Sequence, residues 1–156
     1  MSQGKVSVGS KVPDFSAEST AGEWRLRDAR GTPLVIYFYP RDMTSGCTRE
    51  GEDFAAMYAA FRKARTAVVG VSPDSVASHE KFRAKHKFPF ALLSDPQQSV
   101  CKLFDVYKEK RMYGRQYMGV ERSTFLVDGA GVLRQEWRKV KVAGHAAEVL
   151  AAVQAL

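Results

Sequence analysis

A strongly apolar segment that runs directly into a polar turn and then a helix most restricts how this chain can fold. Residues 34–39 are six consecutive aliphatic or aromatic residues with high strand preference. A continuous run of this length is typical of a strand that is covered on both faces. The polar segment 40–50 follows and leads into an amphipathic helix. One buried face of this helix is predicted by residues spaced at i, i+3, i+4 and i+7, which are Phe54, Met57, Tyr58 and Phe61.

Cys47 falls near the first turn of that expected helix. Thr44 or Ser45 can act as the N-cap, because a hydroxyl there accepts a hydrogen bond from a free backbone N–H. The backbone N–H groups, the helix dipole and the nearby Arg41 and Arg49 favour thiolate over thiol. The alternative is that Cys47 is a small buried apolar residue. Its neighbours in sequence are polar, however, so burying it as an apolar side chain would stabilise the fold little. The local sequence therefore favours a reactive, nucleophilic thiol.

The rest of the chain alternates strand-like and helix-like patterns. Residues 67–71 predict a second buried strand, and a strand–helix–strand order implies a right-handed parallel crossover. We expect one α/β domain over residues 1–156, with a central mixed sheet and helices on both faces. The other expected elements are an N-terminal hairpin in 11–31, a helix over 76–85, a strand over 90–93, a helix around Cys101, a polar loop or irregular hairpin over 108–119, strands over 122–127 and 132–137 joined by a turn, and a last helix opened by Gly144.

Composition and charge limit the class of protein. The hydrophobic content of 45% and charged content of 26% are ordinary for a soluble globular chain, and no apolar run is long enough to span a membrane. Residues 1–5 lack the apolar core of a secretory signal, so a cytoplasmic location is expected. The net charge of +7 is spread along the chain without a nucleic-acid-binding signature. We therefore expect no membrane partner and no specific nucleic-acid partner.

Pro40, Thr44 and Cys47 resemble the PxxxTxxC signature of peroxiredoxins, the thioredoxin-fold thiol peroxidases. The surrounding residues, with segments 88–95 and 122–128 downstream, resemble the branch called peroxiredoxin Q or bacterioferritin comigratory protein. The resemblance covers nearly the whole chain. It implies a thioredoxin-like fold with a central mixed β-sheet, flanking helices and an N-terminal β-hairpin.

The resemblance also implies roles for individual residues. Cys47 would attack a hydroperoxide, either hydrogen peroxide or an organic one, and become a sulfenic acid. The Thr44 hydroxyl would bind the peroxide, and Pro40 would shield the thiolate from water. Arg122, which matches the family's second-strand arginine, would donate to the thiolate and to the peroxide oxygen. Glu50 is either a structural partner of one of the arginines or an acid that stabilises the helix start.

The chain departs from the branch at the positions of the resolving cysteine. Many members of the branch carry the resolving cysteine five residues after the peroxidatic one, where this chain has Glu52. Others carry it in the next helix, where this chain has Arg83 and Ala84. Cys101 remains, and its apolar neighbours favour burial in the core. We therefore predict a one-cysteine mechanism with an external thiol reductant such as thioredoxin, glutaredoxin or glutathione. The alternative is a two-cysteine mechanism in which Cys101 resolves the sulfenic acid.

The residues also bear on other functional classes and on partners. The chain has no Cys-x-x-Cys, which argues against a thioredoxin-like disulfide reductase. A catalytically silent thioredoxin-fold binding or regulatory protein is the competing hypothesis, and the joint presence of Pro40, Thr44, Cys47 and Arg122 argues against it. No cofactor or metal is expected, because neither His79 nor His86 has a partner at metal-ligand spacing. A monomer or a weak dimer is expected.

Overall fold

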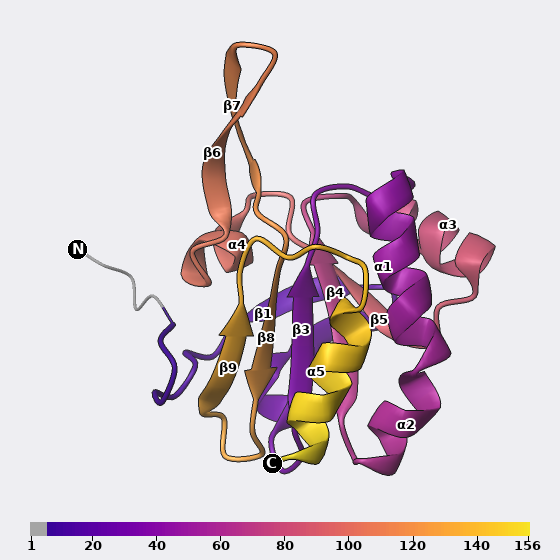
Figure 1. Ribbon diagram of the computed structural model, residues 1–156, viewed down its shortest axis with the longest axis vertical. Coiled ribbons are helices and arrows are strands. Elements are labelled where there is room, and N and C mark those ends of the chain that lie inside the picture. Colours follow the sequence, from indigo (N-terminus) through magenta and orange to yellow (C-terminus); the bar gives the residue numbers. More distant parts are fainter. Residues whose placement is uncertain (1–5) are drawn as a thin grey trace.

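A seven-stranded mixed sheet forms the centre of the computed structural model, which describes residues 6–156 (Figure 1). The strand order is β2-β1-β5-β4-β3-β8-β9, with parallel pairing of β3 to β4 and of β4 to β5 and antiparallel pairing elsewhere. The predicted mixed sheet and N-terminal hairpin are thus confirmed. The strands are β1 (Ser16–Ser19), β2 (Gly22–Arg25), β3 (Leu34–Phe38), β4 (Ala67–Ser72), β5 (Ala91–Ser94), β8 (Ser123–Val127) and β9 (Leu133–Trp137).

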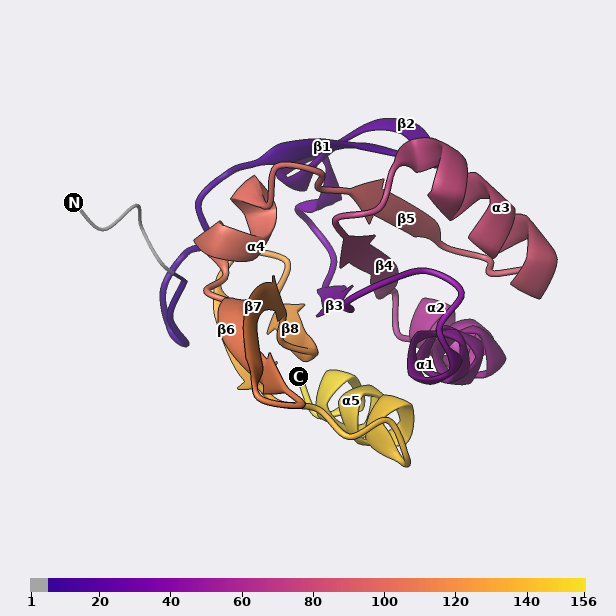
Figure 2. The same cartoon turned by 90° about the horizontal axis from the view of Figure 1, so that it is seen from above.

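Two hydrophobic cores lie on opposite faces of this sheet, because side chains alternate along each strand. In β3, every residue is buried, and alternate residues enter different cores. The Cys47-side core contains Val35 and Tyr37, and the Cys101-side core contains Ile36 and Phe38. Figure 2 shows α4 on the opposite side of the sheet from α1 and α5. The helices are η1 (Leu26–Ala29), α1 (Ser45–Ala56), α2 (Tyr58–Lys63), α3 (Val76–His86), α4 (Ser99–Leu103) and α5 (His145–Gln154).

The helix predicted after Cys47 is divided into α1 and α2. The break is at Met57, whose φ of −100° and ψ of 4° are not helical and whose N–H bonds the Phe54 carbonyl three residues back. Phe54 and Phe61 are both fully buried on either side of the break. The apolar spacing therefore continues across the interruption, and periodicity alone could not reveal it.

The segment predicted as a polar loop or irregular hairpin is a regular antiparallel ribbon formed by β6 (Tyr107–Met112) and β7 (Arg115–Val120). It rises from the end of the central sheet at which α1 begins (Figure 1). Tyr113 and Gly114 at its tip both have positive φ, as a two-residue type I′ hairpin turn requires. Its outer residues are exposed and mix charged side chains with Met112, Tyr113, Tyr117 and Met118, so a regular apolar alternation that would predict strands is missing.

The remaining predicted elements are confirmed. Ser75 caps α3, since its hydroxyl accepts a hydrogen bond from the Ser78 N–H at 3.1 Å. Gly144, with a φ of 76°, precedes α5. Within the described part of the chain, no helix is both long and apolar enough to cross a membrane.

Candidate active site

Cys47 is the third residue of α1, at the end of the sheet where β3 stops and the chain turns back. Its side chain is almost fully buried in the Cys47-side core. Both cysteines of the chain are free thiols. The polar neighbours of Cys47 argued against burial, and that expectation was wrong, because the predicted strand, turn and helix place this thiol below the surface at the first helical turn.

Arg122 approaches this thiol from the short link between β7 and β8. Its Nη2 donates to Cys47 Sγ at 3.3 Å, and its Nη1 donates to Glu50 Oε1 at 2.5 Å. Cys47 and Glu50 are three residues apart, so they share one face of α1. Gly46 leaves room for the guanidinium, because an added Cβ would lie only 3.3 Å from Nη2. The fold thus joins a thiol, a guanidinium and a carboxyl that lie up to 75 residues apart in sequence.

Burial strongly affects the charges in this group. It raises the pKa of Glu50 to about 7, although the positive charge of Arg122 acts to lower that pKa. Burial also acts to lower the pKa of Arg122, but Glu50 and Cys47 outweigh it and raise the pKa above its ordinary value. The guanidinium therefore stays charged beside the sulfur. The second oxygen of Glu50, Oε2, is buried without a hydrogen-bond partner among the described residues.

Two more ionisable groups lie close enough to be affected by Arg122. Burial, with the charge of Arg122, lowers the pKa of His145 to about 4, and His145 Nε2 lies 2.8 Å from Thr124 Oγ1. Burial and the same charge lower the pKa of Lys110 on β6. Sequence reasoning missed both residues, since neither belongs to a recognisable motif and only the fold brings them near the site.

The loop before α1 carries Pro40 and Thr44. Thr44 occupies the N-cap position, but neither its hydroxyl nor that of Ser45 makes the predicted cap hydrogen bond. Instead, Thr44 Oγ1 donates to the Arg41 carbonyl at 2.9 Å, inside the loop. The hydroxyl proton of Thr44 is therefore already used, so Oγ1 can only accept a hydrogen bond from a bound molecule. Pro40 is half-buried beside the buried Tyr39.

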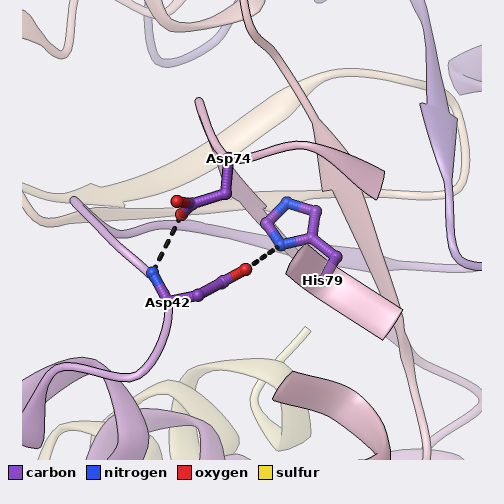
Figure 3. A group of neighbouring side chains, drawn as sticks. All are labelled: Asp42, Asp74 and His79. Atoms are coloured by element: carbon purple, nitrogen blue, oxygen red, sulfur yellow. Dashed lines mark hydrogen bonds and ion pairs between the residues drawn. The ribbon is translucent and has the colours of Figure 1, made fainter. Parts of the chain in front are cut away.

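A polar cluster of the buried Asp42 and His79 with the half-buried Asp74 fixes the middle of this loop (Figure 3). His79 Nδ1 lies 2.7 Å from Asp42 Oδ2, and its Nε2 lies 2.9 Å from the Leu93 carbonyl. Both ring nitrogens are therefore within hydrogen-bond distance of an oxygen atom. The sequence predicted His79 to be a surface or hydrogen-bonded residue; it is hydrogen-bonded and completely buried.

Cys101 lies in the core on the other face of the sheet from Cys47. It sits in α4, and its backbone N–H donates to Asp95 Oδ2 at 2.8 Å. Burial, together with the negative charge of Asp95, raises the pKa of the Cys101 thiol far above its ordinary value. The sheet itself therefore separates the two sulfur atoms.

The family match, the similar sequences and the similar structures all point to one family of proteins. Residues 8–136 match the model of the AhpC/TSA family. Peroxiredoxin Bcp of Bacillus subtilis is 47% identical over 146 residues, which is 93% of each chain, and peroxiredoxin Bcp of Xanthomonas campestris is 57% identical over 130 residues, 83% of this chain and 81% of that protein. The structure of Xanthomonas campestris peroxiredoxin Q superposes with a TM-score of 0.87 at 53% identity and 90% coverage of each chain, which confirms the thioredoxin-like peroxiredoxin fold. A structure of the Xanthomonas campestris bacterioferritin comigratory protein, studied for its alkyl peroxide reduction activity, has a TM-score of 0.87 at 52% identity and covers 90% of each chain.

Proposed function

This chain belongs to the AhpC/TSA family, in the Bcp/PrxQ branch of the peroxiredoxins, and on that premise we propose that Cys47 reduces hydroperoxides by way of a sulfenic acid. One observation carries the proposal. The guanidinium of Arg122 lies 3.3 Å from the Cys47 sulfur and is fixed there by Glu50. A permanently charged, pre-oriented donor stabilises the negative charge that moves from sulfur to the leaving oxygen.

In the first step, the Cys47 thiolate attacks the terminal oxygen of the hydroperoxide. The S–O bond forms as the O–O bond breaks, so Cys47 becomes S–OH and RO⁻ leaves to take a proton as ROH. Arg122 Nη2 supplies a hydrogen bond to the developing charge. Thr44 accepts the O–H of the peroxide, a role supported by its hydroxyl proton already being donated to Arg41. Pro40 keeps water from the thiolate.

The substrates that we propose are alkyl hydroperoxides and hydrogen peroxide. The similar Xanthomonas campestris protein was studied for alkyl peroxide reduction, which supports the first of these. The chemistry at sulfur is the same for both, because only the leaving group differs.

We further propose that an external thiol reduces the sulfenic acid. One thiol displaces water from Cys47–SOH to give a mixed disulfide, and a second thiol releases the Cys47 thiol and a disulfide of the reductant. The reductant would be thioredoxin, glutaredoxin or glutathione. The location of Cys101 on the opposite face of the sheet supports this route, since a disulfide requires Cα atoms within about 7 Å of each other.

Peroxide consumption by Cys47→Ser and Cys101→Ser proteins tests the proposal. With thioredoxin and its reductase as the electron source, we expect no consumption by Cys47→Ser and retained turnover by Cys101→Ser, with circular dichroism confirming both folds. Undiminished consumption by Cys47→Ser would refute the role of Cys47. Loss of turnover in Cys101→Ser, with Cys47 still oxidised by peroxide, would instead support the two-cysteine mechanism.

A further inference from the structure

The buried carboxylate of Asp42 joins the loop between β3 and α1 to the body of the protein. Its Oδ1 accepts a hydrogen bond from Tyr39 Oη at 2.6 Å, and its Oδ2 accepts one from Ser78 Oγ at 2.8 Å. Oδ2 also lies 2.7 Å from His79 Nδ1 (Figure 3). The Asp42 backbone N–H donates to Asp74 Oδ2 at 2.8 Å. The loop is therefore held by α3 and by the turn that follows β4.

The proton positions in this cluster follow from its acceptors. The Leu93 carbonyl can only accept, so His79 Nε2 must carry a proton. Nδ1 lies 2.7 Å from the carboxyl group of Asp42, which already accepts hydrogen bonds from two hydroxyl groups. His79 and Asp42 are both buried, so removing either one would leave a buried polar group without its hydrogen-bond partner.

The residue that follows this attachment is strained. Met43 has a φ of 66°, a left-handed conformation that a side chain such as methionine rarely adopts. Its side chain is exposed, so no packing of Met43 itself accounts for that conformation. Such strain persists only where the surrounding structure imposes it. Asp42 on one side and the start of α1 at Thr44 on the other supply that constraint.

We propose that His79, acting through Asp42, is a positioning residue for the reaction of Cys47 with peroxide. The buried pair holds Met43 in its left-handed conformation, and that conformation sets where Thr44 and the first turn of α1 lie relative to Arg122. His79 itself does not touch the sulfur or the peroxide. The inference rests on the proposed function of Cys47 and names a residue that this function does not use directly.

The test compares two reactions of the same thiol in wild-type and His79→Gln proteins. Glutamine can replace only one of the two hydrogen bonds that the ring makes, to Asp42 and to the Leu93 carbonyl. Oxidation of Cys47 by hydrogen peroxide requires that Thr44, Cys47 and Arg122 be correctly aligned. Its rate, measured by stopped-flow fluorescence, should fall by about 100-fold. Alkylation of Cys47 by iodoacetamide does not require an aligned peroxide, so its rate should change by less than about threefold. His86→Gln, on the same helix, is the matched control and should leave both rates unchanged.

A rescue variant separates positioning from general damage. Asparagine adopts the left-handed conformation far more readily than methionine. Met43→Asn in the His79→Gln background should therefore restore the loop conformation and raise the oxidation rate about tenfold above that of His79→Gln alone. Where His79→Gln does not fold, Ser78→Ala decides the question, because it removes one hydrogen bond to Asp42 and leaves the contact between His79 and Asp42 intact. We expect that variant to oxidise several-fold more slowly, with unchanged alkylation.

Two results would overturn the inference while leaving the proposed function in place. One is equal oxidation rates in wild-type, His79→Gln and Ser78→Ala proteins. The other is an equal loss of oxidation and alkylation rates, which would indicate general damage to the fold. If wild-type Cys47 itself did not react with hydrogen peroxide, the proposed function would fail first, and that result is read from the wild-type protein alone.

Discussion

Cys47 and Cys101 lie in separate hydrophobic cores on opposite faces of one sheet. Adjacent residues of β3 point into one core or the other, so the full thickness of the sheet stands between the two thiols. Joining them would require α1 or α4 to leave its place against the sheet. This relationship supports a role for Cys101 in packing and an external source for the second thiol.

The first prediction concerns the reactivity of Cys101. Burial and the charge of Asp95 raise its pKa far above the ordinary value, so native Cys101 should resist iodoacetamide at pH 8 and react readily in urea. Cys101→Ala should lower the free energy of unfolding by about 1 kcal/mol, since a buried sulfur is lost, and should keep peroxide turnover. Rapid labelling of Cys101 in the native protein would contradict this account.

The second prediction concerns Arg122. Lysine in its place keeps the positive charge but cannot donate to both Glu50 and Cys47 from one rigid plane. Arg122→Lys should therefore slow the oxidation of Cys47 by about 100-fold, measured by stopped-flow kinetics with hydrogen peroxide. Arg115→Lys on β7 is the control and should react at the wild-type rate. Equal rates for the two variants would show that charge alone suffices.

The third prediction concerns Glu50 and pH. Its pKa is raised from 4.5 to about 7 in the folded protein, so the folded state holds this proton more tightly than the unfolded state. The resulting stabilisation is complete below pH 4.5 and is lost as the pH rises through 7; the difference amounts to about 3 kcal/mol. Urea unfolding at pH 5 and pH 8 should show wild type losing this much relative to Glu50→Gln. Parallel pH profiles for the two proteins would contradict the prediction.

The fourth prediction concerns Gly51 in the middle of α1. From helix preference alone, alanine should stabilise this position by about 0.5–1 kcal/mol. In the structure, however, an added Cβ would lie 2.5 Å from Cζ of the buried Phe88. We expect Gly51→Ala to destabilise the protein by about 1–3 kcal/mol, measured by urea denaturation. An increase in stability would show that Phe88 can move away at little cost.

Local patterns in the sequence were sufficient to predict the elements around Cys47. The apolar run of β3, the polar turn after it and the helical spacing of Phe54 and Phe61 are properties of neighbouring residues, and they appear in the structure as expected. The family motif supplied Arg122, which no local pattern could have linked to a thiol so distant in sequence. The contact between them, at 3.3 Å, depends on the pairing of β3 with β8.

Features created by long-range packing were the ones that the sequence could not predict. Asp42 and His79 are 37 residues apart and meet because α3 packs against the sheet, so neither residue carries a local signal of the pair. The choice between two roles for Glu50 likewise depended on where Arg122 would lie. For the β6–β7 ribbon, the sequence predicted a loop or an irregular hairpin and not two regular strands, because these strands are exposed and lack apolar alternation.

Intact-mass measurement after one equivalent of hydrogen peroxide, with and without a dimedone-type trap for sulfenic acid, is the sharpest test of whether Cys47 forms a sulfenic acid. We expect a single adduct that maps to Cys47, with Cys101 still open to alkylation once the protein is unfolded. A loss of two hydrogen atoms without an adduct would mean a disulfide between Cys47 and Cys101 and would contradict the one-cysteine mechanism. No change in mass would contradict the proposed peroxidase chemistry of Cys47 itself.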